Sequence, residues 1–235
     1  MKKIFITIVA SILLSSSVFA ASFNIGATGA IATVEADGKE TTGAGASGTA
    51  NVNKKQVDNE NVAIGSVFAE YESDYWGITL GVEYVPGEAD VSNSVLKRTD
   101  TETSVTGGAA VTSTSRTFQA QATVENLYTA YIELPIYESF FVRAGMASID
   151  VNTEEVKSGN GGSYGNKTLD GTTLGAGFKG NFEANDQINW KIYYEATDFD
   201  TLKLTSSGNS VASETNSIEA DLDVSALKLA IGYRF

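Results

Sequence analysis

Ten charged residues each lie in a stretch of the sequence where polar and apolar side chains alternate. They are Glu70, Glu83, Glu125, Glu133, Arg143, Lys179, Lys191, Glu195, Lys228 and Arg234. The alternation is ambiguous in residues 61–72, and Glu70 belongs to the set if its side chain lies on the polar face there, as we prefer. Five acids and five bases held together could form a network of ion pairs, and a carboxylate pair could also act as general acid and base. No carboxylate pair stands out from this set, so we expect a lumenal charge network.

The composition removes most other chemistry. The chain has no histidine and no cysteine, which excludes Ser-His and Cys-His nucleophiles, a histidine base and the usual zinc ligands. Two acidic doublets, Asp198 with Asp200 and Asp221 with Asp223, could offer oxygen ligands to calcium, but they lack the spacing of an EF-hand. We therefore predict no catalytic residues, no metal site, no cofactor and no enzymatic activity.

The first twenty residues have the pattern of a secretory signal peptide. Lys2 and Lys3 precede an apolar stretch, and Val18 and Ala20 are small residues in the cleavage positions. The apolar stretch is shorter than the roughly 20 residues of a membrane-spanning helix. We expect residues 1–20 to be removed and residues 21–235 to form one domain outside the cytoplasm.

Alternation with a period of two predicts eight strands and no helices. Their expected ranges are 22–35, 61–72, 75–85, 118–134, 139–151, 168–182, 187–198 and 222–235. The connections alternate between long segments rich in Gly, Ser, Thr and Asn and tight turns such as residues 135–138. All four long segments would leave one end of an up-and-down barrel, and three tight turns would leave the other with both chain ends.

The apolar faces of the clearest strands have the length expected for crossing a bilayer. Trp76 and Tyr84 lie toward the ends of one such face, and Trp190 and Tyr194 belong to another. These four aromatic residues are candidates for contact with the lipid interface. The charged residues would then point inward, where each must be paired because an uncompensated buried ion costs several kcal/mol.

The chain ends on a strand that carries every large apolar residue on one face. Leu227, Leu229, Ile231, Tyr233 and Phe235 alternate with Lys228, Ala230, Gly232 and Arg234. In this strand, and in architecture along the whole mature chain, the sequence resembles small eight-stranded outer-membrane barrels of the OmpA and OmpX type, also grouped as porin-family proteins. The resemblance implies an antiparallel transmembrane barrel in the bacterial outer membrane with extracellular loops and periplasmic turns. It also implies that the five alternating residues are read by the barrel assembly machinery. Full-length OmpA has a C-terminal peptidoglycan-binding domain that this sequence lacks.

The net charge bears on possible partners. Without Lys2 and Lys3 the chain has 14 basic and 29 acidic residues, a net charge of about -15, so nucleic acid is not an expected partner. Expected partners are outer-membrane lipid and, during biogenesis, the assembly machinery and periplasmic chaperones. The loops could also bind an extracellular ligand that the sequence does not identify.

Three functions remain open from the sequence. The first is a barrel with a structural or surface-interaction role, whose lumen is blocked by the charge network. The second is a narrow porin-like channel for passive uptake of small solutes, although eight strands leave little room inside. The third is a soluble secreted or periplasmic barrel that binds a ligand.

Overall fold

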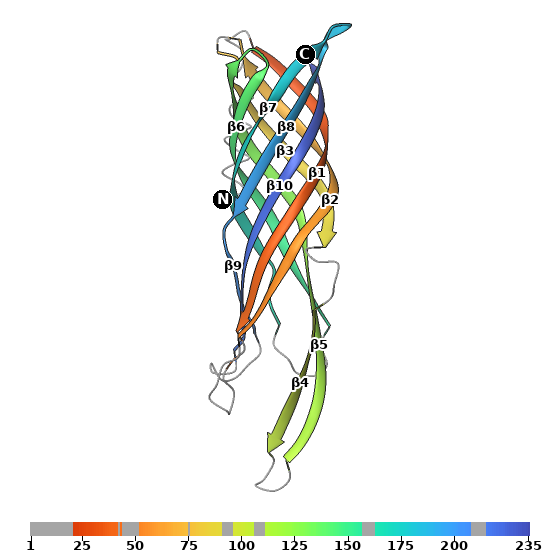
Figure 1. Ribbon diagram of the computed structural model, residues 1–235, viewed down its shortest axis with the longest axis vertical. Helices are drawn as coiled ribbons and strands as arrows, with labels where there is room; N and C mark the ends of the chain where they lie inside the picture. The colour runs from red at the N-terminus through yellow and green to blue at the C-terminus, as the bar shows by residue number, and fades with distance from the viewer. Residues whose placement is uncertain are drawn as a thin grey trace.

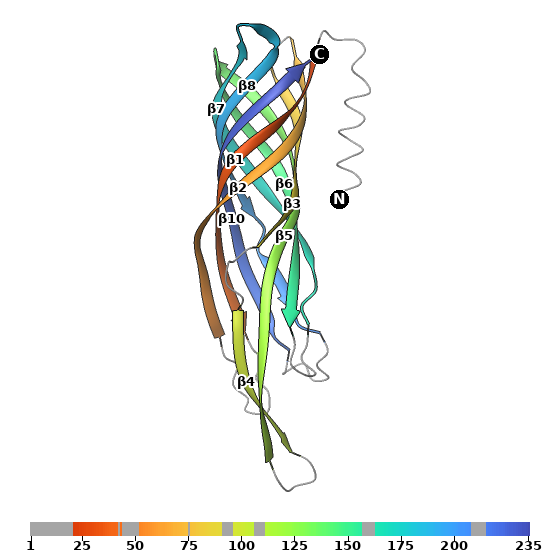
Figure 2. The ribbon, with the colours of Figure 1, turned by 90° about the vertical axis from the view of Figure 1, so that its right-hand side faces the viewer.

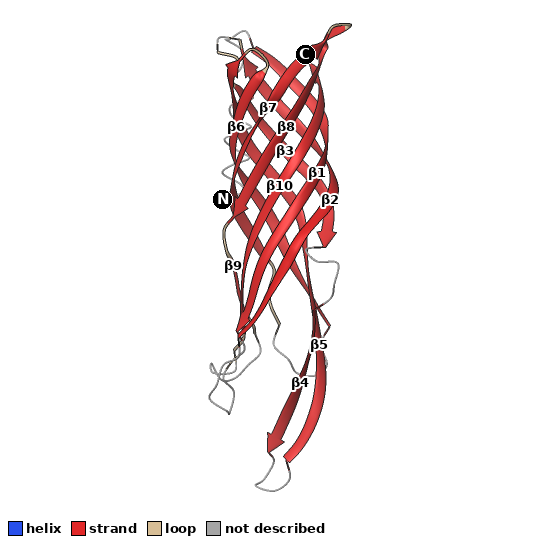
Figure 3. Cartoon of the chain, in the orientation of Figure 1, coloured by secondary structure: helices blue, strands red, loops and turns tan. Residues whose placement is uncertain are grey.

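The computed structural model describes residues 21–41, 43, 52–74, 76–90, 96–105, 111–156, 163–207 and 215–235, and these ranges contain ten strands. The expected signal peptide, residues 1–20, lies outside the described residues. The strands are β1 (Ala21–Thr41), β2 (Val52–Ser73), β3 (Thr79–Asp90), β4 (Leu96–Val105), β5 (Val111–Tyr137), β6 (Phe140–Val156), β7 (Lys167–Phe182), β8 (Asn185–Phe199), β9 (Leu202–Thr205) and β10 (Ser217–Arg234). Figure 3 shows strands and loops only in this part of the chain. Within the described ranges, no helix is long and apolar enough to cross a membrane.

Eight of the strands close into an antiparallel up-and-down barrel. The order is β1, β2, β3, β5, β6, β7, β8 and β10, and β10 pairs back onto β1. The closing register includes Ile25 with Tyr233, and the Phe235 amide donates to the Phe23 carbonyl at 2.8 Å. The predicted eight-stranded antiparallel barrel is therefore confirmed. Figures 1 and 2 show the strands inclined to the long axis, with β1 beside β10.

The two ends of the barrel differ. Phe235 and the short turns that join β5 to β6 and β7 to β8 lie at one end, which we call the turn end (Figure 1). At the opposite loop end, β4 pairs with β5 from Leu96↔Ala120 to Val105↔Val111 and forms a two-stranded ribbon. This ribbon extends beyond the other strands in Figures 1 and 2.

The strands differ from their predicted limits mainly at the loop end. β4 and β9 form inside segments that we expected to be loops, and β5 begins at Val111 instead of Phe118. A polar composition rich in Thr and Ser does not prevent strand pairing, because the ladder hydrogen bonds are made by the backbone. At the turn end, β3 begins at Thr79 instead of Tyr75, and Gly77 in the preceding turn has a φ of 61°.

The polarity of the two faces inverts along the barrel while the side-chain phase stays constant. On β10, Leu222 and Lys228 are both buried inside, whereas Asp221 and Leu227 are both exposed outside. The inside is therefore apolar toward the loop end and charged toward the turn end, and the outside follows the reverse rule. β6 repeats the pattern, because Ile149 is buried inside toward the loop end and Arg143 is buried inside toward the turn end.

The inversion marks where the barrel leaves the lipid. Toward the turn end the outer face carries a belt of exposed apolar side chains, among them Ile25, Ile31, Val67, Leu80, Leu134, Met146, Leu174, Phe178, Ile192, Leu227, Leu229 and Ile231. On β10 this belt runs from Leu227 to the chain end, which at about 3.3 Å per residue and a tilt of about 40° is roughly 20 Å of height. Beyond the belt the outer face is polar, as expected for a wall that stands in water.

The loop-end part of the barrel is filled by an apolar core. Ala147, Ile149, Val151, Leu169, Phe199, Leu202 and Leu222 form one buried cluster, and side chains such as Val34, Val124, Leu127 and Val224 pack against it. These residues come from β1, β5, β6, β7, β8, β9 and β10, so the core spans the lumen instead of lining one wall.

One junction in the barrel wall is shorter than the others. β2 pairs with β1 over nearly its whole length, but among the described residues it pairs with β3 only from Val67↔Tyr84 to Glu72↔Thr79. A register shift follows on β3 between Val85 and Glu88, where Gly87 has a φ of 103°. The strands β2 and β3 therefore separate toward the loop end, near the edge of the apolar belt on that side.

Candidate functional site, a charged cluster inside the barrel

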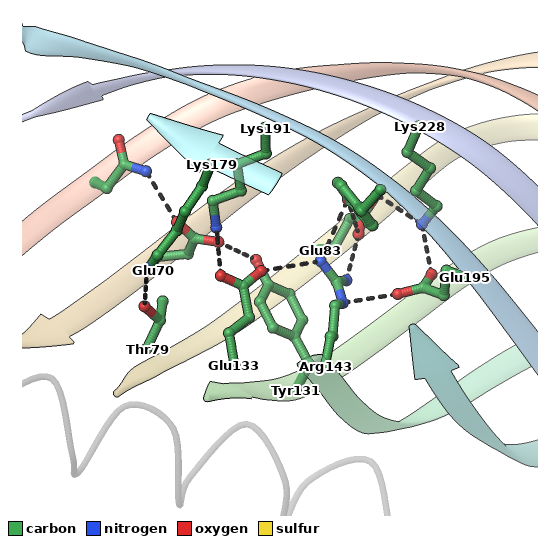
Figure 4. A network of polar contacts seen from close by, with 12 residues as sticks. Glu70, Thr79, Glu83, Tyr131, Glu133, Arg143, Lys179, Lys191, Glu195 and Lys228 are labelled. Atoms are coloured by element: carbon green, nitrogen blue, oxygen red, sulfur yellow. Dashed lines mark hydrogen bonds and ion pairs between the residues drawn. The ribbon is translucent and has the colours of Figure 1, made fainter. Parts of the chain in front are cut away.

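The central charged side chains come from six strands and converge inside the turn-end half of the barrel (Figure 4). Glu70 lies on β2, Glu83 on β3, Glu133 on β5, Arg143 on β6, Lys191 and Glu195 on β8, and Lys228 on β10. All seven are buried, with Glu133 completely inaccessible and Lys228 only 5% exposed. Of the described residues these are all the buried charged ones, four acids and three bases. We call them the charged cluster.

One half of the charged cluster is a balanced group of two acids and two bases. The Arg143 guanidinium donates to Glu83 at 2.6 Å, and its Nε lies 2.7 Å from a Glu195 oxygen. Lys228 Nζ bridges the other oxygens of the same two carboxylates, at 3.1 Å to Glu83 and 2.6 Å to Glu195. Ser66 adds a hydrogen bond to Glu83 at 2.6 Å. Each of these carboxylates therefore contacts both cations.

The other half contains two acids and one base. Lys191 Nζ donates to Glu70, in a short contact, and to Glu133 at 2.7 Å. Glu70 also accepts hydrogen bonds from the Tyr131 hydroxyl at 2.7 Å and from Asn24 at 2.9 Å. The second oxygen of Glu133 faces only an Arg143 nitrogen at 3.7 Å, beyond hydrogen-bond distance, among the described residues.

Aromatic rings fill the remaining space around these charges. The Arg143 guanidinium stacks over the Tyr131 ring at 3.3 Å from its centroid and hydrogen-bonds the Tyr193 hydroxyl at 3.2 Å. Gly81 makes room for a ring, because a Cβ there would overlap the Tyr131 ring. A Cβ at Gly177 would overlap the Ile192 carbonyl oxygen and the backbone and Cβ of Tyr193. Glycine at these two strand positions therefore relieves crowding in the narrow interior.

A second, looser set of charges surrounds a small cavity at the turn end. Lys179 Nζ lies 3.5 Å and Arg234 3.6 Å from the same oxygen of Glu72. The cavity has a volume of about 240 Å³, and its walls include these three residues together with Glu70 and Lys191. The charged cluster forms the floor of this cavity on the side toward the loop end.

One residue of the predicted network lies elsewhere, and one residue of the observed network was missed. Glu125 hydrogen-bonds Asn152 at 2.8 Å, and assigning it to the lumen is wrong because a bulge on β5 between Glu125 and Tyr128 reverses the side-chain phase. Glu72, which contacts Lys179 and Arg234, is not among the predicted residues and is the last residue of the predicted strand 61–72. Its parity with Glu70 was the available signal. With Glu72 in place of Glu125, five acids and five bases still face one another.

The other residues that the sequence singled out lie on the outer surface. Trp76 is exposed in the turn before β3, Tyr194 is exposed on β8, and Trp190 is half-buried against Gly180. Tyr84 stacks on Tyr128 with ring centroids 4.6 Å apart. Leu227, Leu229, Ile231, Tyr233 and Phe235 all point outward, and the Phe235 ring lies 5.0 Å from that of Tyr233 and 6.3 Å from that of Phe23. Their reading by an assembly machinery stays a prediction.

The acidic doublets lie on the outer face beyond the apolar belt. Asp223 pairs in register with Asp198 on β8, and Asp221 pairs with Asp37 on β1. Partial desolvation and then the charges of Asp198, Asp221 and Asp37 raise the pKa of Asp223. Within the described ranges, no group of three or more acidic side chains is arranged to hold a metal ion.

The turn-end half has charged side chains inside and apolar side chains outside. This arrangement is typical of a barrel that spans a membrane, because a water-soluble barrel would expose the charges and bury the apolar belt. The chain is a small transmembrane β-barrel of the outer-membrane type. Its closed ladder also satisfies the rule that backbone groups in lipid must pair within the protein.

The chain is similar to several solved structures of outer-membrane proteins. The outer membrane protein OprG from Pseudomonas aeruginosa matches with 11% identity and a TM-score of 0.49, covering 92% of this chain and 97% of that one. Ail of Yersinia pestis, solved with the heparin analogue sucrose octasulfate, has 13% identity and a TM-score of 0.42, covering 92% and 100%. The outer membrane protease OmpT from Escherichia coli has 8% identity and a TM-score of 0.41, covering 90% and 97%. Likenesses this distant carry no argument about function. No protein-family model and no curated protein matches the chain.

Proposed function

We propose that the protein is an outer-membrane barrel with a closed lumen and a structural or surface-interaction role. The observation that carries this proposal is that two layers cross the lumen in series. The charged cluster holds Arg143 and three more ions in direct contact near the turn end, and the apolar core around Leu169 fills the loop-end half. An ion would have to displace salt bridges in the first layer and lose its hydration in the second.

Planar bilayers test the closed lumen. Purified, heat-modifiable protein should insert without producing steady current steps, while a wide porin added to the same bilayer verifies that the assay detects channels. Large, steady steps from the protein alone would refute the proposal and favour the narrow porin-like channel. In that rival the turn-end cavity beside Lys179 and Arg234 would be a vestibule, and the charged cluster would have to move to admit solutes.

The surface role rests on the ribbon of β4 and β5. Its described strands pair only with each other over residues 111–118 of β5, and the barrel ladder between β5 and β6 starts at Gln119↔Val156. A variant that lacks residues 98–116 should therefore still form a barrel that resists detergent until it is boiled. Loss of that resistance would show that the ribbon stabilises the barrel. The ribbon would then have a structural role, and the proposal that it binds a partner would lose its support.

The proposed partners of the barrel are outer-membrane lipid and, during biogenesis, the assembly machinery and periplasmic chaperones. Deleting Phe235 should lower the yield of folded protein in the outer membrane, because this residue ends the outward apolar series and contacts Phe23 at the barrel seam. Arg234→Ala is the matched control, since its side chain points inward to Glu72. Equal yields for the deletion and the control would contradict the assembly role of Phe235.

Absence of catalysis is part of the proposal. The chain contains no histidine or cysteine, and the buried carboxylates are occupied by salt bridges instead of facing a substrate cleft. A soluble ligand-binding barrel is disfavoured by the apolar belt, in which Ile31 and Leu174 are each 63% exposed. Fractionation should place the protein in the detergent-extracted outer membrane, and recovery from the periplasmic wash would overturn this assignment.

A further inference from the structure

The charged cluster has one more acid than it has bases, and the excess can be located. Glu83 and Glu195 are balanced by Arg143 and Lys228, with each carboxylate in contact with both cations. Glu70 and Glu133 share Lys191 alone, apart from the Arg143 nitrogen at 3.7 Å from Glu133. The surplus negative charge therefore belongs to the pair Glu70 and Glu133.

The two carboxyls of this pair are treated very differently by their surroundings. Glu70 accepts from three donors, which are Lys191, the Tyr131 hydroxyl and the Asn24 amide. Glu133 has Lys191 on one oxygen, and its other oxygen has no hydrogen-bond partner among the described residues although it is fully buried. Hydrogen bonds from several donors favour the ionised form, whereas burial without donors disfavours it.

The other charges that face Glu133 do not supply the missing cation. Arg143 on β6 and Lys228 on β10 are engaged by Glu83 and Glu195, and the nearest further cations belong to the looser set around the turn-end cavity. There Lys179 on β7 and Arg234 on β10 contact Glu72 on β2, and Lys179 also donates at 3.3 Å to the hydroxyl of Thr79, which pairs in register with Glu133. Among the described residues, neither cation forms a salt bridge with Glu70 or Glu133. A fourth ionised carboxylate in the cluster would have no cation of its own in direct contact, although Lys179 and Arg234 balance the charge of the lumen as a whole. A buried charge without a contacting partner costs several kcal/mol.

We propose that the carboxyl pair of Glu70 and Glu133 binds one proton at neutral pH and that the proton resides on Glu133. The seven buried groups then carry three negative and three positive charges, and the charged cluster is neutral. Glu133 is a proton-binding site inside the plug, and ionising it would place two carboxylates beside the single ammonium of Lys191. This inference concerns the charge state of the lumen and holds whether or not the barrel has the surface role proposed above.

Substitution by glutamine distinguishes this proton from ordinary ion pairing. Glu133→Gln replaces a neutral acid by a neutral amide of the same shape. Its stability should match that of the wild type below about pH 4, where the glutamate is protonated in both states, and should exceed it at pH 7, where the wild-type chain must bind a proton to fold. Glu195→Gln is the matched control, because it removes an ionised partner of Arg143 and Lys228 and should lower the folded-to-unfolded ratio at least tenfold. Equal losses for the two variants, or failure of Glu133→Gln to fold, would overturn the proposal.

The pH dependence of folding gives an independent readout. If the native state holds a proton that the unfolded chain releases, the folded-to-unfolded ratio of the wild type relative to Glu133→Gln should rise about tenfold per pH unit as pH falls from 7 toward 5. The infrared spectrum of the wild type at pH 7 should also contain a protonated-carboxyl band that Glu133→Gln lacks. A pH-independent ratio and no such band would contradict the proposal, and so would wild-type stability that requires sodium or potassium, because the metal ion would then supply the charge.

Discussion

Replacing Arg143 by methionine should destabilise the barrel more than any other single change in the lumen. Arg143 is 2% exposed, contacts Glu83 and Glu195 through separate nitrogens, and stacks on Tyr131. Methionine preserves most of the side-chain length and removes the charge. The two carboxylates would then share Lys228 alone, which leaves one buried charge uncompensated.

The size of the effect follows from that uncompensated charge. Removing one partner of a buried ion pair costs about 3–5 kcal/mol, and loss of the cation–π contact adds about 1 kcal/mol. Glu195→Gln in the same chain restores the balance between Glu83 and Lys228, so the double variant should recover about half of the lost stability. The coupling between the two sites equals the recovered stability, about 2–3 kcal/mol, plus the loss that Glu195→Gln causes alone, which is at least about 1.4 kcal/mol for a tenfold effect. It should therefore reach about 3.4 kcal/mol or more, at the top of the range for interacting neighbours.

Reversible denaturant unfolding in detergent or lipid measures this coupling. The fluorescence of the two tryptophans reports unfolding, and gel mobility with and without boiling confirms the folded fraction. Arg143→Met, Glu195→Gln and the double variant complete the cycle with the wild type. A loss below about 1 kcal/mol for Arg143→Met would refute the reasoning, because an exposed ion pair has that value. Strict additivity in the double variant would refute the contact between the two sites.

Three further predictions concern other parts of the barrel. Asp223→Asn should raise stability at pH 7, because the raised pKa of Asp223 means that its ionisation disfavours folding. The gain should vanish below about pH 3, where the aspartate is protonated in both states, and a gain that persists there would contradict this origin. Hydrogen exchange should find every other amide of residues 61–66 unprotected while residues 67–72 are protected throughout, since β3 pairs only with the latter; uniform protection would contradict the separation of β2 and β3. Gly177→Ala should cost about 1–3 kcal/mol because its Cβ would overlap the Ile192 carbonyl oxygen and the Cβ of Tyr193, and a neutral effect in urea unfolding would contradict that packing.

The turn-end half of the barrel could be predicted from the sequence because most large apolar residues of its strands face lipid and the charged residues face the lumen. In residues 227–235 every outward residue is apolar and every inward one is small or charged, so period two gives both the strand and its faces. Pairing of β10 with β1 is expected as well, because a barrel leaves no free edge in lipid, whereas the register of that pairing does not follow from alternation.

The loop-end half was harder because the same strands change solvent. Leu222 and Val224 lie on the inward-facing side of β10 and pack in the apolar core. An interpretation that expects apolar residues only on the lipid-facing side gives these two residues no place. The sequence does contain the pattern that indicates this core. Near Ala226 the inward-facing residues of β10 change from apolar to charged, and the outward-facing residues change from acidic to apolar, while the alternation itself continues. Reading this change would have predicted the apolar core and the height at which the wall leaves the lipid.

The charged cluster was predicted by residue type but not by partner. Parity places Glu83, Lys191 and Lys228 inside, whereas the pairing of Lys228 with Glu83 joins residues 145 positions apart and depends on strand tilt and stagger around the whole barrel. Glu125 shows the limit of parity, because the bulge between Glu125 and Tyr128 reverses the face, and nothing in the local sequence marks it. Asn126, with a φ of 56°, absorbs the extra residue.

The closed lumen is the central claim, and a buried cysteine tests it most directly because the chain has no natural cysteine. Thr173 lies inside β7 and is 0% exposed, while Asn181 is exposed on the same strand at the turn end. Folded Thr173→Cys should not react with a small, charged thiol reagent until the barrel is unfolded, and Asn181→Cys should react at once. Equal reaction rates in the folded state would show that water reaches the centre of the lumen and would contradict the account.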